Sequence, residues 1–139
     1  RLSRAPNGVY YVQHVSRFRG TPAKVENSIR NTASADGAGV RIYLEEDPGQ
    51  AGKADVANLI RQLAGYVVHT ARPTVDKETR ARPLSSAAEH GNVKIVRGPW
   101  NEDFLAEIEA FPLGDHDDQV DGLSGAFNAL AQAAPIWVA

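Results

Sequence analysis

The alternation of hydrophobic and polar residues predicts several short β-strands. Val40, Ile42 and Leu44 alternate with polar residues, which is the pattern of a strand with one buried face. Asn7-Gly8 is a strong hairpin turn signal, and it separates a short N-terminal strand from a longer segment rich in Val and Tyr. The expected strands are residues 1–4, 9–16, 40–45, 66–70 and 93–97.

Apolar residues spaced three and four positions apart predict helices between these strands. Thr21 and Pro22 supply an N-cap and a first-turn proline, and the helix that follows should turn Val25 and Ile29 inward. A second helix carries the stripe Val56, Leu59, Ile60 and Leu63. The expected helices are residues 22–34, 51–64, a segment capped by Asn101, and 117–133.

The segment 71–85 has no clear apolar period and is rich in basic residues. We therefore expect a long functional loop there, followed by a short helix over residues 85–90. Strands that alternate with helices in this order predict a mixed α/β domain in three layers.

Composition narrows the chemistry that this domain can perform. The chain of 139 residues is long enough for one domain with a core of its own. It has no cysteine, so disulfides and thiolate metal sites are excluded, and any metal must be held by oxygen or imidazole. That ligand set favours magnesium, manganese or calcium. No segment has the length and hydrophobicity of a membrane span, and the net charge of -2 does not by itself indicate nucleic-acid binding.

A cluster of acidic residues precedes the last expected helix, in the stretch GDHDDQVDGLSGAF. On a helix, Asp117, Asp118 and Asp121 would fall within an arc of roughly 100°. A divalent cation would remove the repulsion between these carboxylates. We interpret Asp118 and Asp121 as metal ligands and Asp117 as either an N-cap or a ligand. Asp115 and His116 are interpreted as a solvated acid and a loop residue.

A second acidic group, in LEEDPGQAGKAD, follows the strand 40–45. Its glycines and Lys53 do not have the spacing of a phosphate-binding loop, so we reject that interpretation. In α/β sheets, sites collect where strands end. Glu45 and Asp47 share one side of the chain, whereas Glu46 is expected in a solvated turn. The two acidic groups together predict a divalent metal site.

Several segments of the chain resemble the nuclease domain of phage terminase large subunits. FPLGDHDDQVDGLSGAF resembles the closing motif of that domain, and LEEDPGQAGKAD resembles its central acidic motif. VDKETRARPLSSAAEHGNVKIVRGPW and GVYYVQHVSRFRGTPAKVE resemble the segments between and before them. The resemblance implies an RNase H-like α/β fold, with a central mixed sheet flanked by helices, and a DNA endonuclease activity that uses two Mg²⁺ or Mn²⁺ ions.

The resemblance also implies the roles of particular residues. The catalytic and metal-binding acids would be Glu45, Asp118 and Asp121, with Asp47 and Asp117 as further metal ligands, and the basic residues that contact DNA would be Lys77, Arg80 and Arg82. The first-strand aspartate of the family has no counterpart here. We therefore expect residues 1–139 to be a single nuclease domain, cut from a longer terminase without its first strand and its ATPase domain.

The partners implied are double-stranded DNA and, through the full-length protein, the portal and the small terminase subunit, with no membrane involved. The protein would act in the cytoplasm of a bacterial host, as a phage or prophage product. Two alternatives remain open from the sequence. One is a nuclease of the junction-resolvase kind, and the other is a non-catalytic DNA- or protein-docking module of a packaging motor.

Overall fold

The computed structural model describes residues 1–132, which fall into two compact units. The first unit is built from Arg1–Arg17 together with the chain from Val75 onward, and the second is Phe18–Thr74. The acidic and basic candidate residues all lie within the described part, whereas the end of the last expected helix, at Ala133, lies outside it.

The first unit is a mixed three-stranded sheet with three helices. Its elements are β1 (Leu2–Arg4), β2 (Tyr10–Val12), α3 (Lys77–Glu89), β5 (Val93–Ile95), α4 (Asn101–Ala110) and α5 (Asp118–Gln132). Strand β2 pairs antiparallel with β1 and parallel with β5, which gives the order β1-β2-β5. The predicted hairpin at Asn7-Gly8 joins β1 to β2, and the positive φ of 85° at Gly8 explains why glycine is needed there.

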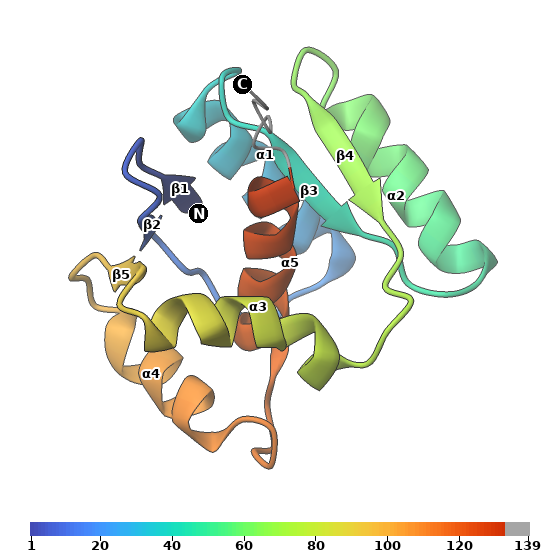
Figure 1. Ribbon diagram of the computed structural model, residues 1–139. Helices are drawn as coiled ribbons and strands as arrows, with labels where there is room; N and C mark the ends of the chain where they lie inside the picture. Colours follow the sequence, from blue (N-terminus) through green and yellow to red (C-terminus); the bar gives the residue numbers. More distant parts are fainter. Residues whose placement is uncertain (133–139) are drawn as a thin grey trace. The chain divides into compact units, whose positions relative to one another are not determined.

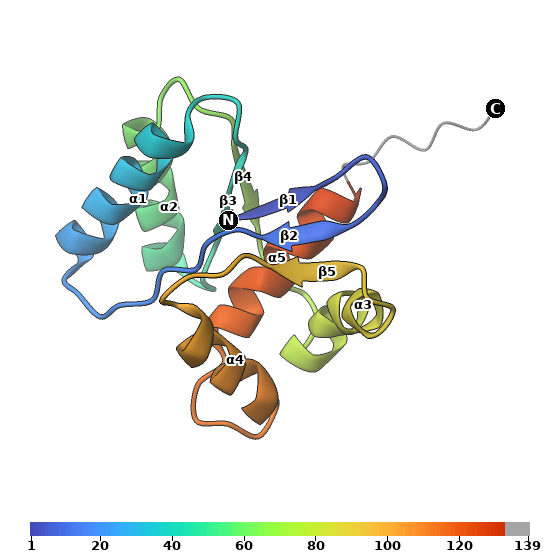
Figure 2. The ribbon, with the colours of Figure 1, turned by 90° about the vertical axis from the view of Figure 1, so that its left-hand side faces the viewer.

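Helix α5 packs across this sheet and fixes the core of the first unit. Figure 2 shows α5 running behind the three strands, with α3 and α4 beside it. Tyr10 of β2, Leu84 of α3 and Phe127 of α5 form the buried cluster, and the rings of Tyr10 and Phe127 lie 4.4 Å apart. Phe104 of α4 is fully buried. Val120 and Phe127 of α5 are buried, so the apolar side of this helix faces the core.

The segment 71–85 is not a long loop, and this corrects the sequence prediction. Residues from Lys77 to Glu89 form the continuous helix α3. Asp76 caps it, because its carboxylate accepts a hydrogen bond from the Thr79 backbone N–H. The sequence conceals this helix because Pro83 lies inside it, where proline is disfavoured, and because few apolar residues mark its buried side. Buried Ala81 and Leu84 supply the tertiary packing that outweighs these local preferences.

The second unit is a two-stranded parallel sheet with two helices. Its elements are α1 (Pro22–Asp36), β3 (Ile42–Glu45), α2 (Gln50–Gln62) and β4 (Val68–Ala71). Figures 1 and 2 show β3 beside β4, with α1 and α2 together on one face of the pair. Glu26 of α1 accepts hydrogen bonds from the side chains of Asn58 and Gln62 of α2, at 3.2 and 2.9 Å.

The two helices of the second unit follow the sequence predictions with two exceptions. Thr21 caps α1 as expected, with its hydroxyl oxygen 3.4 Å from the Lys24 backbone nitrogen. Val25 was expected inside but is 39% exposed, and Ile60 of the predicted α2 stripe is 42% exposed. Val56 and Leu63 are buried, so the true core-facing stripe of α2 is narrower than the sequence suggested.

In the described part of the chain, no helix combines the length and the apolar character needed to cross a membrane.

Candidate functional site

The acidic residues of the last helix lie at its first turn, as predicted. Asp118 is the first residue of α5, and Asp117 directly precedes it, with its carbonyl oxygen 2.9 Å from the Asp121 backbone nitrogen. Asp118 is exposed, whereas Asp117 and Asp121 are half-buried. The three acids are therefore in different surroundings, although they are neighbours in the sequence.

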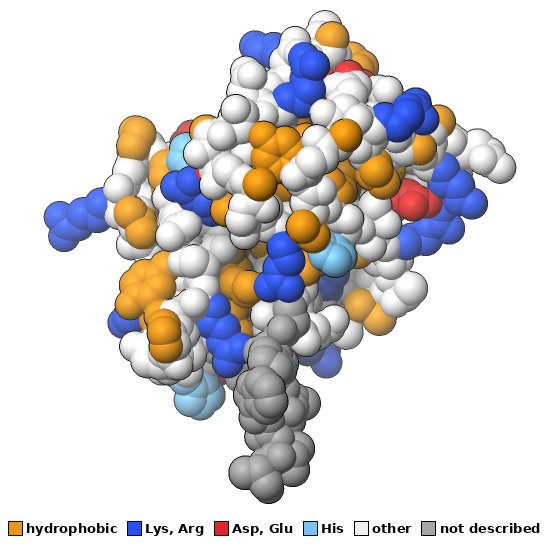
Figure 3. Space-filling model, turned by 90° about the horizontal axis from the view of Figure 1, so that it is seen from above, with side chains coloured by type: hydrophobic (Ala, Val, Ile, Leu, Met, Phe, Trp, Pro, Cys, Tyr) orange, Lys and Arg blue, Asp and Glu red, His pale blue; other side chains and the backbone are white. Residues whose placement is uncertain are grey.

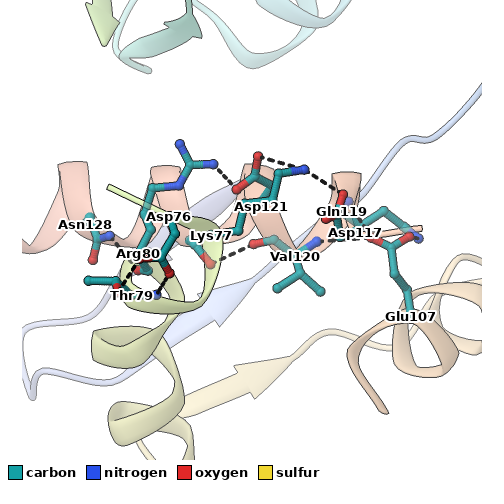
Figure 4. Close-up of polar contacts among 11 residues, drawn as sticks. Asp76, Lys77, Thr79, Arg80, Glu107, Asp117, Gln119, Val120, Asp121 and Asn128 are labelled. Carbon is teal, nitrogen blue, oxygen red and sulfur yellow. Dashed lines mark hydrogen bonds and ion pairs between the residues drawn. The ribbon is translucent and has the colours of Figure 1, made fainter. Parts of the chain in front are cut away.

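Two basic residues of α3 neutralise Asp117 and Asp121. The Lys77 ammonium nitrogen lies 2.7 Å from Asp117 Oδ1 and 3.8 Å from Asp121 Oδ2. The Arg80 guanidinium donates to Asp121 Oδ1, and the two side chains are only 11% and 16% exposed. Figure 4 shows both basic side chains directed from α3 toward the start of α5. The sequence suggested a group of repelling acids, but the folded chain pairs them with cations from a helix about 40 positions earlier.

The first turn of α5 is capped by a residue of another helix. Glu107 of α4 accepts hydrogen bonds from the backbone N–H groups of Gln119 and Val120, at 2.6 and 3.2 Å, and from the Gln119 side-chain amide at 2.6 Å (Figure 4). The Glu107 side chain is 3% exposed, and Arg17 lies 3.9 Å from it. Its negative charge lies where free N–H groups and the helix dipole favour an anion.

The sequence left Asp117 open as either an N-cap or a metal ligand. Asp117 directly precedes α5, but its carboxylate contacts Lys77, and the free N–H groups of α5 donate to Glu107. The sequence did not indicate this cap from another helix. One signal was available: Glu107 lies three residues after the buried Phe104, so it shares the inner side of α4.

Asn101 also differs from its prediction. Its side chain accepts from the Gly98 N–H and donates to the Val96 carbonyl, so it closes the preceding turn, while Trp100 stands at the N-cap position of α4.

The start of α3 is fixed independently of the acids of α5. Hydrogen bonds from the Thr79 backbone N–H and hydroxyl reach the Asp76 carboxylate, both at 2.8 Å. These bonds lower the pKa of Asp76 below its ordinary value of 3.8. One turn further on, the Arg80 carbonyl accepts from the Asn128 side chain at 2.9 Å. The backbone that carries Lys77 and Arg80 is thus held by contacts that do not involve Asp117 or Asp121.

The second acidic group lies at the end of β3, in the other unit. Ile42 and Leu44 are half-buried, whereas Tyr43 and Glu45 are exposed, so Glu45 lies on the face of β3 opposite the two apolar residues. Tyr43 stacks on His69 of β4 on this open face, with ring centroids 5.2 Å apart. The alternation that the sequence predicted along this strand is therefore confirmed.

The turn after β3 is closely packed and is not simply exposed to solvent. Glu46 was expected to be solvated, but its carboxylate is half-buried and lies 2.5 Å from the Arg72 guanidinium. Gly52 approaches the Asp47 backbone so closely that a Cβ on Gly52 would collide with the Asp47 carbonyl oxygen. Asp47 itself is exposed. The glycine that resembles part of a phosphate-binding loop thus serves to pack the turn.

The residues present fit a divalent cation in part. Within residues 1–132, no three His, Asp or Glu side chains come together closely enough to form a metal site. Asp117 and Asp121, however, both turn a carboxylate oxygen toward one cationic nitrogen, that of Lys77. Oxygen ligands of this kind suit magnesium or manganese. Two of the predicted ligands therefore already converge on a shared positive charge.

The predicted DNA-binding residues have different environments on α3. Lys77 and Arg80 face α5, whereas Arg82 is exposed and lines a neighbouring apolar pocket together with Glu78. The pocket, of about 510 Å³, lies among α3, β5, α4 and α5 of the first unit. On the face shown in Figure 3, Lys and Arg side chains are scattered among apolar and neutral residues and do not merge into one patch.

A comparison with protein families identifies the chain. The family model described as the terminase RNaseH-like domain matches residues 2–130. No curated protein and no solved structure gives a significant match. The match confirms the resemblance and the RNase H-like α/β class that the motifs indicated, and it spans nearly all of the described residues. The chain therefore belongs to the terminase RNaseH-like domain family.

Proposed function

We propose that this chain is a metal-dependent endonuclease that cleaves double-stranded DNA during viral genome packaging. Membership of the terminase RNaseH-like family supports a nuclease or packaging role. The observation that carries the proposal is the convergence of Asp117 and Asp121 on the single Lys77 ammonium, because two carboxylates that already share one cation are suited to share a metal ion.

In this proposal, Asp118 and Asp121 of α5 and Glu45 of β3 hold Mg²⁺ or Mn²⁺, with Asp47 and Asp117 as further ligands. When two such ions are bound, they supply an activated water nucleophile and offset the charge that develops on the leaving 3′ oxygen. The protein then needs no nucleophilic side chain, which agrees with the absence of cysteine. The role of the carboxylates is to place the cations and the scissile phosphate.

The basic residues of α3 provide the contact with the DNA backbone. Lys77 is half-exposed and Arg82 is exposed, so both can reach a phosphate from the edge of the acidic site. Arg80 is buried against Asp121, and we assign it mainly to orienting that carboxylate. Contacts of this kind read the backbone and not the bases, so cleavage should depend weakly on sequence.

A plasmid-cleavage assay tests this function. With Mn²⁺ or Mg²⁺ we expect nicking and linearisation that EDTA abolishes. Asp121→Asn should remove the activity, whereas Asp103→Asn, which changes an exposed acid in the first turn of α4, should retain it. Cleavage that persists in EDTA or in Asp121→Asn would refute the proposal.

A docking module of a packaging motor is the second candidate. The apolar pocket of the first unit, bordered by Arg82 and Glu78, favours it, because apolar surface that is open to solvent can mark a contact site for another protein. A chain that binds DNA or motor components without cleaving in any divalent metal would support this alternative. The junction-resolvase alternative is disfavoured by the family match.

The wider setting follows from the same proposal. Acting within a full-length terminase, the chain would meet the portal and the small terminase subunit in the cytoplasm of a bacterial host, in a phage or prophage context.

A further inference from the structure

Lys77 occupies the place in the first unit where two carboxylates converge. Its ammonium group lies 2.7 Å from Asp117 Oδ1 and 3.8 Å from Asp121 Oδ2. An ammonium group is a compact point charge with three donors, so it can serve two carboxylates at once, as a metal ion does. A guanidinium group, with its fixed planar fork, is less able to do so.

We propose that Lys77 is a built-in substitute for the divalent cation. In the metal-free protein its ammonium group neutralises Asp117 and Asp121, and it leaves them when a divalent ion enters. Metal binding and the release of Lys77 are then one coupled event. This inference rests on the proposed function, and it adds a competitor for the metal that the family assignment does not contain.

The surroundings of Lys77 allow its side chain to move without the helix. The Lys77 side chain is 49% exposed, so its ammonium group can turn into solvent or toward a phosphate. Its backbone stays in place because Asp76 caps α3 through two hydrogen bonds with Thr79. Only the rotatable bonds of one flexible side chain have to change.

Arg80, unlike Lys77, is largely buried, and we expect it to keep its contact with Asp121 when a metal ion binds. Its side chain is 11% exposed, it bonds to Asp121 Oδ1, and its carbonyl oxygen is held by Asn128. Arg80 therefore positions one oxygen of Asp121, while the other oxygen, Oδ2, faces Lys77. This division leaves Oδ2 available to a metal as soon as the ammonium group departs.

If Lys77 competes with the metal, removing its charge should strengthen metal binding. We expect Lys77→Gln to bind Mn²⁺ about threefold to tenfold more tightly than the wild type in the absence of DNA, which is the scale of a half-exposed ion pair together with one repelling charge. Lys94→Gln is the matched control, because it removes the same charge from an exposed site on β5 and should change the affinity less than about twofold.

A second measurement follows Lys77 itself. Linkage requires the metal to weaken the ion pair as much as the ion pair weakens metal binding. Labelling of the wild type with an amine-reactive reagent, read by mass spectrometry, should therefore become faster at Lys77 when Mn²⁺ is added and stay constant at Lys94. An effect of general charge alone would not produce this selective change.

The outcomes separate this inference from the proposed function. Tighter Mn²⁺ binding by Lys77→Gln together with faster labelling of Lys77 supports the substitution. If the wild type binds Mn²⁺, Asp121→Asn abolishes that binding, and Lys77→Gln binds no more tightly, the substitution is wrong and the nuclease proposal stands. If neither the wild type nor Lys77→Gln binds Mn²⁺, both are overturned.

Discussion

The backbone nitrogen of Gln119 lies 2.6 Å from Glu107 Oε1, and its side-chain amide nitrogen lies 2.6 Å from Oε2 of the same carboxylate. This double contact joins α4 to the first turn of α5, directly beside Asp118 and Asp121. The helix that carries the candidate metal ligands is therefore held in place by a buried acid of a neighbouring helix. Three donors would lose their acceptor if this carboxylate were removed.

We predict that Glu107→Ala lowers the free energy of unfolding by about 2–4 kcal/mol, because it leaves buried donors unsatisfied at a helix start. Glu107→Gln should lower the free energy of unfolding by less than Glu107→Ala does, because its amide oxygen can still accept hydrogen bonds. It should still be destabilising, because its NH₂ group replaces an acceptor and faces a donor. Denaturant unfolding measures both. Glu109→Ala, at an exposed position of the same helix, serves as the control and should stay within about 0.5 kcal/mol of the wild type. A Glu107→Ala protein as stable as Glu109→Ala would contradict the assigned cap.

Asp121→Asn should lower the stability of the metal-free protein by about 1–2 kcal/mol, because it removes the charge that faces the largely buried Arg80. The repulsion among the acids that the sequence indicated would by itself give the opposite sign. Asp118→Asn, at an exposed position, should change the stability little. Thermal melts in EDTA compare the two variants. A rise in melting temperature for Asp121→Asn would mean that repulsion between the acids outweighs the pairing with Arg80.

The Asp76 cap should give α3 a defined pH dependence. The pKa of Asp76 is lowered in the folded state by the Thr79 hydrogen bonds, so its contribution to stability is present above the unfolded-state pKa, near 3.8, and is lost as the pH falls through the lower folded-state pKa. Asp76→Ala should therefore melt below the wild type at pH 7, and the gap should shrink on acidification below about pH 3.8. A gap that is the same at both pH values would argue against this origin.

Removing basic residues of α3 should weaken DNA binding in a salt-dependent way. Each side chain that no longer neutralises a phosphate should lower the slope of log Kd against log salt by about 0.9, so the double variant Lys77→Gln/Arg82→Gln should show a decrease of up to about twice that. Binding to a short duplex, measured at several salt concentrations in EDTA and in a divalent metal, gives the slope. Arg30→Gln, at an exposed position on α1, is the control. Equal slopes for the double variant and the control would remove these residues from the DNA interface.

Local signals in the sequence predicted local structure well. Asn7-Gly8 marked the β1–β2 hairpin, and Thr21 with Pro22 marked the start of α1, because turn and cap chemistry is decided within a few residues. The period-two pattern placed Tyr43 and Glu45 on one face of β3 for the same reason. Helix α3 could not be predicted in this way, because its internal Pro83 opposes helix formation locally and the packing that outweighs it is tertiary.

The candidate site was predictable in its acids but not in their partners. The motif at the start of α5 pointed to Asp117, Asp118 and Asp121, and all three lie there. Their neutralisation by Lys77 and Arg80 joins residues far apart in the chain, and no periodicity records such a pairing. The cap from Glu107 is likewise a contact between helices. The sequence therefore located the charges, and the fold determines how they are balanced.

The central proposal is that Glu45 and Asp121 are ligands of the same bound cations. A crystal structure of the protein soaked in Mn²⁺, with anomalous data, tests it most directly. We predict anomalous density in direct contact with carboxylate oxygens of both Glu45 and Asp121, with the Lys77 ammonium displaced from Asp121. Manganese bound by Asp121 while Glu45 lies out of reach of the ion and its waters, or no manganese at either acid, would contradict the claim.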